Sequence, residues 1–194
     1  MQGSSDRKTQ THERILEVAA RAIRRGGYAG IGVADIMKEA GLTHGGFYAH
    51  FASRDAMLVE AMQRAAAQGD QHVAGEAAQR RKAGDSALAA LVNTYLHDSQ
   101  LTGAECGCVV AALASEMPRQ QEAVLVAARE RVQHLLDAVR AALPGEASGH
   151  APAITASLVG GLQLARTLGS RPGKALLASI RHSLLQQYDP RNAS

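Results

Sequence analysis

The segment over residues 31–54, which reads IGVADIMKEAGLTHGGFYAHFASR, constrains the fold of this chain more than any other part. In its first half, apolar residues such as Ile36 and Ala40 recur at helical spacing, so a short helix there would bury one face. Gly41 suits the residue after a helix end, and Thr43 suits the N-cap of a second short helix. Two short helices joined by a tight glycine turn predict a helix-turn-helix.

The second short helix, expected to end near Phe51, has a composition that favours binding over a purely structural role. Phe47 and Phe51 lie four residues apart, so both can point into a core. Gly45 and Gly46 each cost a helix roughly 1 kcal/mol relative to alanine, so helix propensity does not explain them. A bare first turn instead lets a phosphate approach free N–H groups at the positive end of the helix dipole.

This segment resembles the DNA-binding domain of TetR-family transcriptional regulators. The resemblance runs from about residue 15 to residue 58 and rests on a Gly-Tyr pair, then V-x-D-I, then A-G-L-T-x-G-x-F-Y-x-H-F-x-S-[KR]. It implies that the second short helix is a recognition helix that enters the major groove of double-stranded DNA. The sequence departs from the family pattern at Gly46, where a side chain often helps to read bases, and at Ala49, which replaces a frequent aromatic residue or histidine.

The resemblance also assigns roles to individual residues. Thr43 and His44 are expected to contact base edges. Tyr48, Arg54 and the amides near Gly45 are expected to contact phosphate. The full expected DNA-binding set is Thr43, His44, Gly45, Gly46, Tyr48, His50 and Arg54.

Helical periodicity continues on both sides of this segment. Residues 1–8 read as a disordered, solvated tail, with an arm that contacts DNA phosphate through Arg7 and Lys8 as the alternative. A helix is expected from Thr9 or Thr11 to Arg25, and a long one capped by Ser53 is expected to reach about Arg81. Further helices are expected over residues 84–96, 107–117, 119–143, 151–168 and 172–188.

These patterns predict an all-α protein. A helix-turn-helix DNA-binding domain is expected over residues 1–52, and a helical effector-binding and dimerisation domain over residues 53–194. The low aromatic content of 3% agrees, because strands are rich in aromatic and β-branched residues. A net charge of +3 permits a nucleic-acid partner but does not demand one.

The last two expected helices are candidates for a subunit interface. The first of them is apolar on more than one side, and such a helix must be buried against more than one partner. The resemblance agrees, since the last two helices of each subunit form a four-helix bundle in the dimers of that family. The expected interface residues are Leu158, Leu162, Ala165, Leu176, Ile180 and Leu184.

The sequence contains no nucleophile elbow, P-loop or paired zinc spacing, so no enzyme activity, cofactor or metal site is predicted. The polar N-terminus and the short apolar runs predict a cytoplasmic protein that does not enter a membrane. Cys106 and Cys108 are the only cysteines, which fits a reducing compartment. At a helix start, Cys106 can become a reactive thiolate, although simple packing of small thiols is the alternative.

Taken together, the sequence predicts a homodimeric transcriptional repressor that is released from a palindromic operator by a small-molecule effector. The effector pocket is expected among the middle helices, near Met62, Tyr95 and Cys106. Three alternatives stay open: a redox or electrophile sensor that acts through Cys106 with the same DNA-binding output, a ligand-binding protein with no DNA role, and an unusual all-α enzyme.

Overall fold

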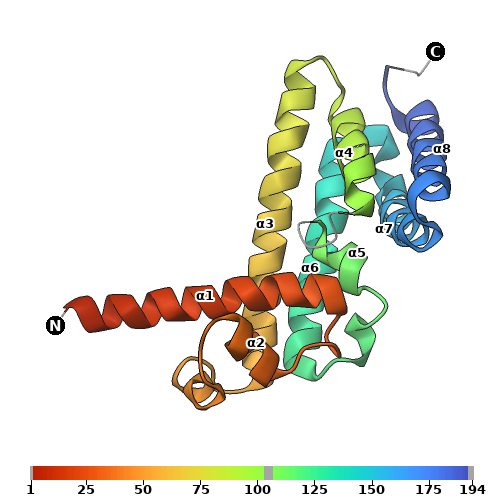
Figure 1. The fold of residues 1–194 in the computed structure, drawn as a ribbon. Coiled ribbons are helices and arrows are strands. Elements are labelled where there is room, and N and C mark those ends of the chain that lie inside the picture. Colours follow the sequence, from red (N-terminus) through yellow and green to blue (C-terminus); the bar gives the residue numbers. More distant parts are fainter. Residues whose placement is uncertain (1, 103–106, 192–194) are drawn as a thin grey trace.

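The computed structural model describes residues 2–102 and 107–191, the side chains of residues 2–5 excepted. Within these ranges every regular element is a helix, so the all-α prediction is confirmed. Figure 1 shows α1 lying across the lower half of the long helix α3, with the later helices packed beside the upper half of α3. No helix in the described part of the chain is both long and apolar enough to cross a bilayer.

The helix α1 (Gln2–Gly26) begins earlier than the sequence predicted. The prediction of a disordered tail over residues 1–8 is wrong for the described residues, because helix begins at Gln2. The stretch contains no proline, and a helix anchored by buried residues such as Ile15 gains one hydrogen bond for each residue it adds. Arg7 and Lys8 therefore lie on a helix.

The helix-turn-helix has the expected connection. The helix α2 (Val33–Glu39) is followed by Gly41 at φ +70°, a left-handed conformation that glycine adopts at low cost. The second helix, η1 (His44–Ala49), is a 3-10 helix with i→i+3 bonds such as His50 N to Phe47 O at 2.9 Å. Thr43 occupies the N-cap position, but its side chain makes no capping hydrogen bond.

The next helix, α3 (Arg54–Lys82), begins and ends where the sequence predicted. Ser53 caps it as expected, since Ser53 Oγ accepts a hydrogen bond from the backbone amide of Ala56 at 3.0 Å. Asp55 lies in the first turn, near the positive end of the helix dipole.

The C-terminal half is a bundle of helices of unequal length. Its elements are α4 (Ala87–Tyr95), η2 (Asp98–Leu101), α5 (Val109–Leu113), η4 (Met117–Arg119), α6 (Glu122–Ala142), η5 (Gly145–His150), α7 (Ala151–Leu168) and α8 (Ser170–Tyr188). The helix predicted over residues 107–117 is shorter than expected and ends at Leu113. Ser86 caps α4, a role that the sequence analysis did not assign, by accepting from the amide of Ala89 at 2.9 Å.

Two hydrophobic clusters form the interior. The first joins α1, α2, η1 and the first half of α3 to α5 and the start of α6, and includes Ile15, Phe47 and Val124. The second joins α4 and the end of α6 to α7 and α8, and includes Leu88 and Leu158. The first cluster spans both sides of the boundary predicted at residue 53, so the helix-turn-helix shares its core with α5 and α6.

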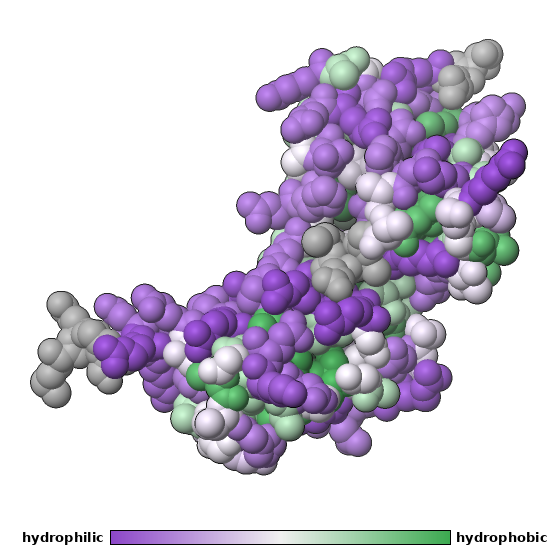
Figure 2. All heavy atoms as spheres, in the orientation of Figure 1, coloured by the Kyte–Doolittle hydropathy of each residue, from purple (hydrophilic) through white to green (hydrophobic). Residues whose placement is uncertain are grey.

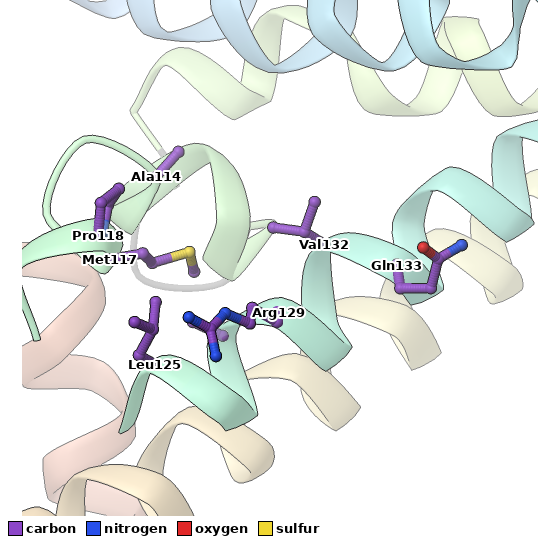
Figure 3. Close-up of a pocket in the computed structure, with 8 residues that line it drawn as sticks. Ala114, Met117, Pro118, Leu125, Arg129, Val132 and Gln133 are labelled. Carbon is purple, nitrogen blue, oxygen red and sulfur yellow. The ribbon is translucent and has the colours of Figure 1, made fainter. Parts of the chain in front are cut away.

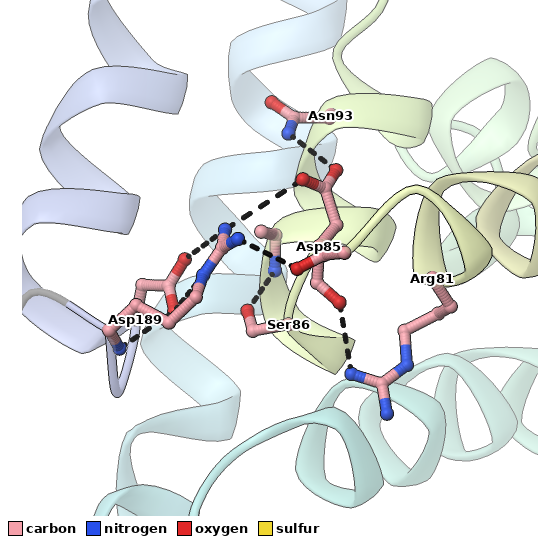
Figure 4. Close-up of polar contacts among 8 residues, drawn as sticks. Arg81, Asp85, Ser86, Asn93 and Asp189 are labelled. Carbon is pink, nitrogen blue, oxygen red and sulfur yellow. Dashed lines mark hydrogen bonds and ion pairs between the residues drawn. The ribbon is translucent and has the colours of Figure 1, made fainter.

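A polar cluster fastens the end of α8 to the turn between α3 and α4 (Figure 4). Arg191 donates to the Asp189 carboxylate at 3.0 Å and to the backbone oxygen of Gly84 at 2.9 Å. Asp85 accepts from the Asn93 amide at 3.3 Å. Burial alone would raise the pKa of Asp189, but hydrogen bonds from Arg191 and Ser86 lower that pKa below its ordinary value.

Candidate nucleic-acid interface

The 3-10 helix η1 is anchored by two aromatic rings and presents a third to solvent. Phe47 and Phe51 are buried and stack with ring centroids 5.5 Å apart. Tyr48 lies between them in sequence and is 73% exposed. Tyr48 touches the edge of the Phe47 ring, with centroids 5.2 Å apart, and most of its side chain faces solvent.

The start of η1 is open to solvent. Thr43, His44 and Gly45 are exposed, whereas Gly46 is half-buried. A Cβ added at Gly45 would meet nothing within 4 Å among the described residues, and one at Gly46 would make only ordinary contacts, the nearest with Met37 Cε at 3.7 Å. Neither glycine is therefore required by packing inside the chain. This agrees with the interpretation that both leave room for an approaching backbone from outside.

His50 ends η1 in a group of titratable residues. Its Nδ1 is buried without a hydrogen-bond partner in the described chain, and its ring centroid lies 6.2 Å from that of His12. His12 stacks on Phe51 and lies 2.8 Å from a carboxylate oxygen of Glu60. Burial lowers the pKa of His50, and the nearby cations His12 and Lys8 lower it further. The sequence analysis did not anticipate the contact with His12.

The N-terminal part of α1 runs past the end of η1. Arg7, Lys8 and Thr11 line a shallow surface pocket together with Ala49 and His50. Both basic side chains are exposed. Two cations thus lie beside the recognition helix, which is the arrangement expected of residues that bind a phosphate backbone.

Arg54 makes contacts that the sequence analysis missed. Its guanidinium donates to the backbone oxygen of Tyr28 and, at 3.4 Å, to that of Ile31, and the side chain is half-buried. These bonds hold the loop between α1 and α2 against the start of α3. Its contact with phosphate stays a prediction.

Glu116, which precedes η4, connects this loop to the C-terminal half of the molecule. Its Oε2 accepts from the backbone amide of Tyr28 at 2.9 Å. Gly27 has φ +70°, and a Cβ there would lie 2.0 Å from Glu116 Oε1, so the carboxylate occupies the space of the missing side chain. Burial, and secondarily the charge of Glu116, raises the pKa of Tyr28. The Tyr28 hydroxyl donates to the sulfur of Met62 at 3.1 Å.

A cavity of about 310 Å³ lies among α3, α4, α6 and the residues that precede α5. Of the three residues expected at an effector pocket, Tyr95 lines this cavity, Met62 belongs to the first hydrophobic cluster, and Cys106 lies outside the described residues. The other cysteine, Cys108, lines the cavity. A Cβ at Gly69 would lie 3.2 Å from the backbone oxygen of Gly107, so this glycine allows the close approach that forms one wall.

Tyr95 and Cys108, which line this cavity, interact electrostatically with each other and with Arg166. Burial raises the pKa of the Tyr95 phenol well above its ordinary value, and the adjacent Cys108 thiol adds to this shift. Burial lowers the pKa of Arg166, whose Nε donates to the backbone oxygen of Gln100 at 3.0 Å.

A second, more open groove of about 540 Å³ lies between η4 and α6. Figure 3 shows Met117 and Leu125 on either side of it, with the guanidinium of Arg129 beside Leu125. Glu116 lies in the chain between two residues that line this groove, Ala114 and Met117.

The residues expected at a subunit interface divide into two groups. Leu158, Leu162, Ala165 and Leu184 are buried in the second hydrophobic cluster of the single chain, whereas Leu176 and Ile180 are half-buried. Packing between α7 and α8 accounts for the burial of the first group, so these four side chains offer little surface to a second subunit. Leu164 and Leu168 on α7 are instead 61% and 54% exposed.

The fold and this surface define an all-α helix-turn-helix protein with a separate cavity among α3, α4 and α6 that opens to solvent. Residues 15–61 match the family model described as bacterial regulatory proteins, tetR family. This N-terminal part of the chain, which contains the helix-turn-helix, is thus similar to the DNA-binding domain of TetR-family transcriptional regulators.

Solved structures have the same fold over nearly the whole chain. A TetR-family transcriptional regulator from Agrobacterium tumefaciens is 24% identical, covers 93% of this chain and 98% of its own, and gives a TM-score of 0.74. A TetR transcriptional regulator from Chloroflexus aurantiacus is 23% identical, with coverages of 94% and 98% and a TM-score of 0.77. The reduced form of NemR from E. coli is 20% identical, with coverages of 89% and 96% and a TM-score of 0.72. None of the curated proteins matches the chain.

Proposed function

We propose that this regulator is a homodimeric repressor that binds a palindromic operator and is released from it by a small-molecule effector. The exposure of Tyr48 beside an open, glycine-containing helix start is the observation that carries the proposal. Thr43 and His44 contact base edges in the major groove. Tyr48, the amides near Gly45 and the basic pair Arg7 and Lys8 contact phosphate.

The dimer forms through the outer face of α7 and α8. Figure 2 shows hydrophobic residues on the side of the molecule where these helices lie, and others over its lower part, on a surface that is mostly hydrophilic. Exposed Leu164 and Leu168 support this choice, since large apolar side chains on one helix face favour burial against a partner. A second copy related by a two-fold axis would present two recognition helices to half-sites about one helical turn apart.

Effector release works through α3. This helix begins next to η1 and, further along, lines the internal cavity with Ala66 and Gly69. A ligand that favours one tilt of α3 changes the spacing of the recognition helices. The ligand can change the free energy of operator binding only by the difference in its own binding free energy between the two tilts of α3, typically 1 to 3 kcal/mol.

Selection of bound sites from random double-stranded DNA tests the DNA-binding role. A palindromic consensus is expected, and Tyr48→Ala should weaken binding to every sequence by a similar factor and reduce the salt dependence of affinity. Val126→Ala removes another exposed apolar side chain, on α6, and serves as the matched control. Failure to enrich any site would favour a ligand-binding protein without a DNA role.

Thiol chemistry is the second candidate for the control step. Cys108 lines the cavity beside Tyr95, which favours a thiol that a small reactive molecule can reach. Operator release by an oxidant or an electrophile should then be lost in at least one of the single variants Cys106→Ser and Cys108→Ser, and in the double variant. Release that persists in the double variant would exclude this mechanism.

A further inference from the structure

We propose that the internal cavity binds a compact hydrophobic monocarboxylate, whose carboxylate is held by Arg131 and whose apolar body lies among α3, α4 and α6. The inference rests on the proposed function of this cavity as the effector site, and it names the chemical class of the effector.

The cavity walls are mostly small and apolar. The residues without charge that line it are Ala66, Gly69, Val73, Ala74, Ala77, Leu91, Tyr95, Cys108, Val109, Leu135 and Ala138. Its volume of about 310 Å³ lies at the lower end of the range of roughly 300 to 1,000 Å³ for ligand pockets, so the ligand must be small. Burial of a hydrocarbon body against such walls supplies about 25 cal/mol per Å² of apolar surface.

Charged groups line the same cavity: Asp70 from α3, and Arg131 and His134 from α6. Arg131 Nη2 donates to both carboxylate oxygens of Asp70, at 3.1 and 2.9 Å. His134 Nδ1 lies 3.7 Å from the same carboxylate. Two basic groups thus share one carboxylate at the cavity.

Two further polar atoms lie there with bonding capacity left. Arg131 Nε is buried and has no hydrogen-bond partner among the described residues, and the buried Tyr95 Oη has only the adjacent Cys108 thiol beside it. The arginine Nε can only donate, and a tyrosine hydroxyl can donate as well as accept. Because an unpaired buried donor costs about 1 to 3 kcal/mol, a ligand that brings acceptor oxygens would gain by satisfying them.

A carboxylate fits these groups better than an amine or an uncharged molecule. Asp70 already demonstrates that a carboxylate can accept from this guanidinium, and charge-assisted bonds are the stronger ones. The Asp70 side chain is 46% exposed and that of Arg131 only 18%, so Asp70 can turn to water when a ligand carboxylate takes its place. An ammonium group could pair with Asp70, but it has no acceptor to offer to the buried Arg131 Nε.

Ligand binding would then act on α3 directly. The Arg131–Asp70 pair joins α6 to α3, and a ligand that captures Arg131 removes this connection. Since α3 begins at Arg54, next to η1, the loss of the connection is transmitted toward the DNA-binding end of the molecule.

Calorimetric titration of the full-length protein without DNA tests the ligand class. The probes are octanoate, octanamide and octylamine, which share one hydrocarbon body, and phenylacetate with phenylacetamide as an aromatic pair. Each acid should bind at least tenfold more tightly than its amide, and octylamine should not bind. Arg131→Gln should weaken octanoate binding at least tenfold, and Tyr95→Phe should weaken it by a smaller factor.

Two further variants sharpen the result. Asp70→Asn removes the competing carboxylate and should strengthen octanoate binding severalfold. Arg140→Gln removes an exposed arginine of α6 that pairs with Asp137, and should change nothing. Equal binding of acid and amide, or acid binding that is unaffected by Arg131→Gln and Tyr95→Phe, would overturn the assignment. So would the absence of binding by every acid.

Operator binding by the same ligand-free preparation separates the two proposals. A protein that binds its selected DNA site but no carboxylate retains the DNA-binding role and loses the ligand assignment. A protein that binds octanoate at Arg131 but no DNA retains the ligand assignment and loses the repressor role.

Discussion

The surroundings of His50 disfavour the protonated form of its ring, whereas a DNA phosphate would favour that form. Burial and the electrostatic effect of His12 and Lys8 lower its pKa, so free protein holds His50 neutral near pH 7. A phosphate beside the ring would raise that pKa, and binding would then take up a proton. We expect operator affinity to rise as the pH falls from about 7.5 to about 5.5, a range set by the ordinary histidine pKa near 6.5.

The variant His50→Gln should flatten this pH dependence, because glutamine cannot titrate. The exposed His182 on α8 supplies the control, since His182→Gln should leave the pH dependence as it is. Fluorescence anisotropy with labelled operator at constant ionic strength measures both. If operator affinity depends on pH in His50→Gln as it does in the parent, the His50 ring does not contact a DNA phosphate. The folding stability of the DNA-free protein changes with pH in the opposite direction. Because the pKa of His50 is lower in the folded chain than in the unfolded chain, the free energy of unfolding decreases as the pH falls through 6.5.

Single residues differ in how far the sequence could predict them. The burial of Phe47 and Phe51 and the exposure of Tyr48 follow from spacing alone, because a short helix has only one inward face. The partners of Arg54 do not, since they are backbone oxygens that the loop between α1 and α2 brings into reach. Likewise, only the fold shows that Cys108 lines the cavity.

At the scale of elements, the start of α3 depends on one side chain. Ser53 Oγ satisfies the amide of Ala56, and without it this donor loses its capping partner at the junction with η1. Ser53→Ala should lower the free energy of unfolding by about 1 kcal/mol, the typical cost of losing an N-cap.

Urea unfolding followed by circular dichroism measures this change. The exposed Ser157 on α7, whose hydroxyl only bonds back to the Ala153 oxygen, is the matched control. Ser157→Ala should leave the unfolding midpoint almost unchanged. Equal midpoints for Ser53→Ala and the parent would contradict a stabilising cap.

Helical periodicity predicted the long elements well and the short ones poorly. The bounds of α7 match the predicted 151–168, because a long apolar stripe and flanking turn residues specify both ends. The 3-10 geometry of η1 was not predicted. A sequence of six residues with two glycines does not distinguish a 3-10 helix from an α-helix. The early start of α1 was missed because its polar residues carry no periodicity.

At the scale of the whole molecule, Glu116 connects the helices after α4 to the loop between α1 and α2. Glu116→Ala should leave the buried amide of Tyr28 without an acceptor and lower the free energy of unfolding by about 1 to 2 kcal/mol. Glu116→Gln keeps an acceptor oxygen and should cost much less. Chemical denaturation measures the free energy of unfolding of both variants. If that free energy falls by a similar amount in both, the charge of Glu116 and not its hydrogen bond stabilises the fold.

The C-terminal end is held by a contact that depends on pH. Because the folded state lowers the pKa of Asp189, this group stabilises the fold above the ordinary aspartate value of 3.8 and loses its contribution as the pH falls through the folded value. Asp189→Asn should destabilise the protein by about 1 to 2 kcal/mol at pH 7.

The difference between Asp189→Asn and the parent should shrink as the pH falls below about 4, because the unfolded parent chain then takes up a proton at Asp189 while the folded chain keeps the carboxylate charged. Thermal unfolding from pH 3 to pH 7 measures it. The exposed Asp137 on α6 provides the control, since Asp137→Asn should have a small effect at every pH. A constant difference for Asp189→Asn across the range would show that its charge contributes nothing.

The all-α class follows from the sequence, but the division of the interior does not. Apolar stripes show which side of a helix is buried and leave open which neighbour covers it. For this reason Leu158 and Leu162 were expected between subunits, whereas packing against α8 and neighbouring helices buries them within one chain.

The length of α3 has a mechanical consequence. With 29 residues at about 1.5 Å each, this helix is a rigid rod roughly 44 Å long. Rotating it by only about 5° around one end carries the other end through roughly 4 Å, over a tenth of the 34 to 36 Å that separates successive half-sites on DNA. In the proposed mechanism, a lever of this length would turn a displacement smaller than a side chain at the cavity into a misfit with the operator.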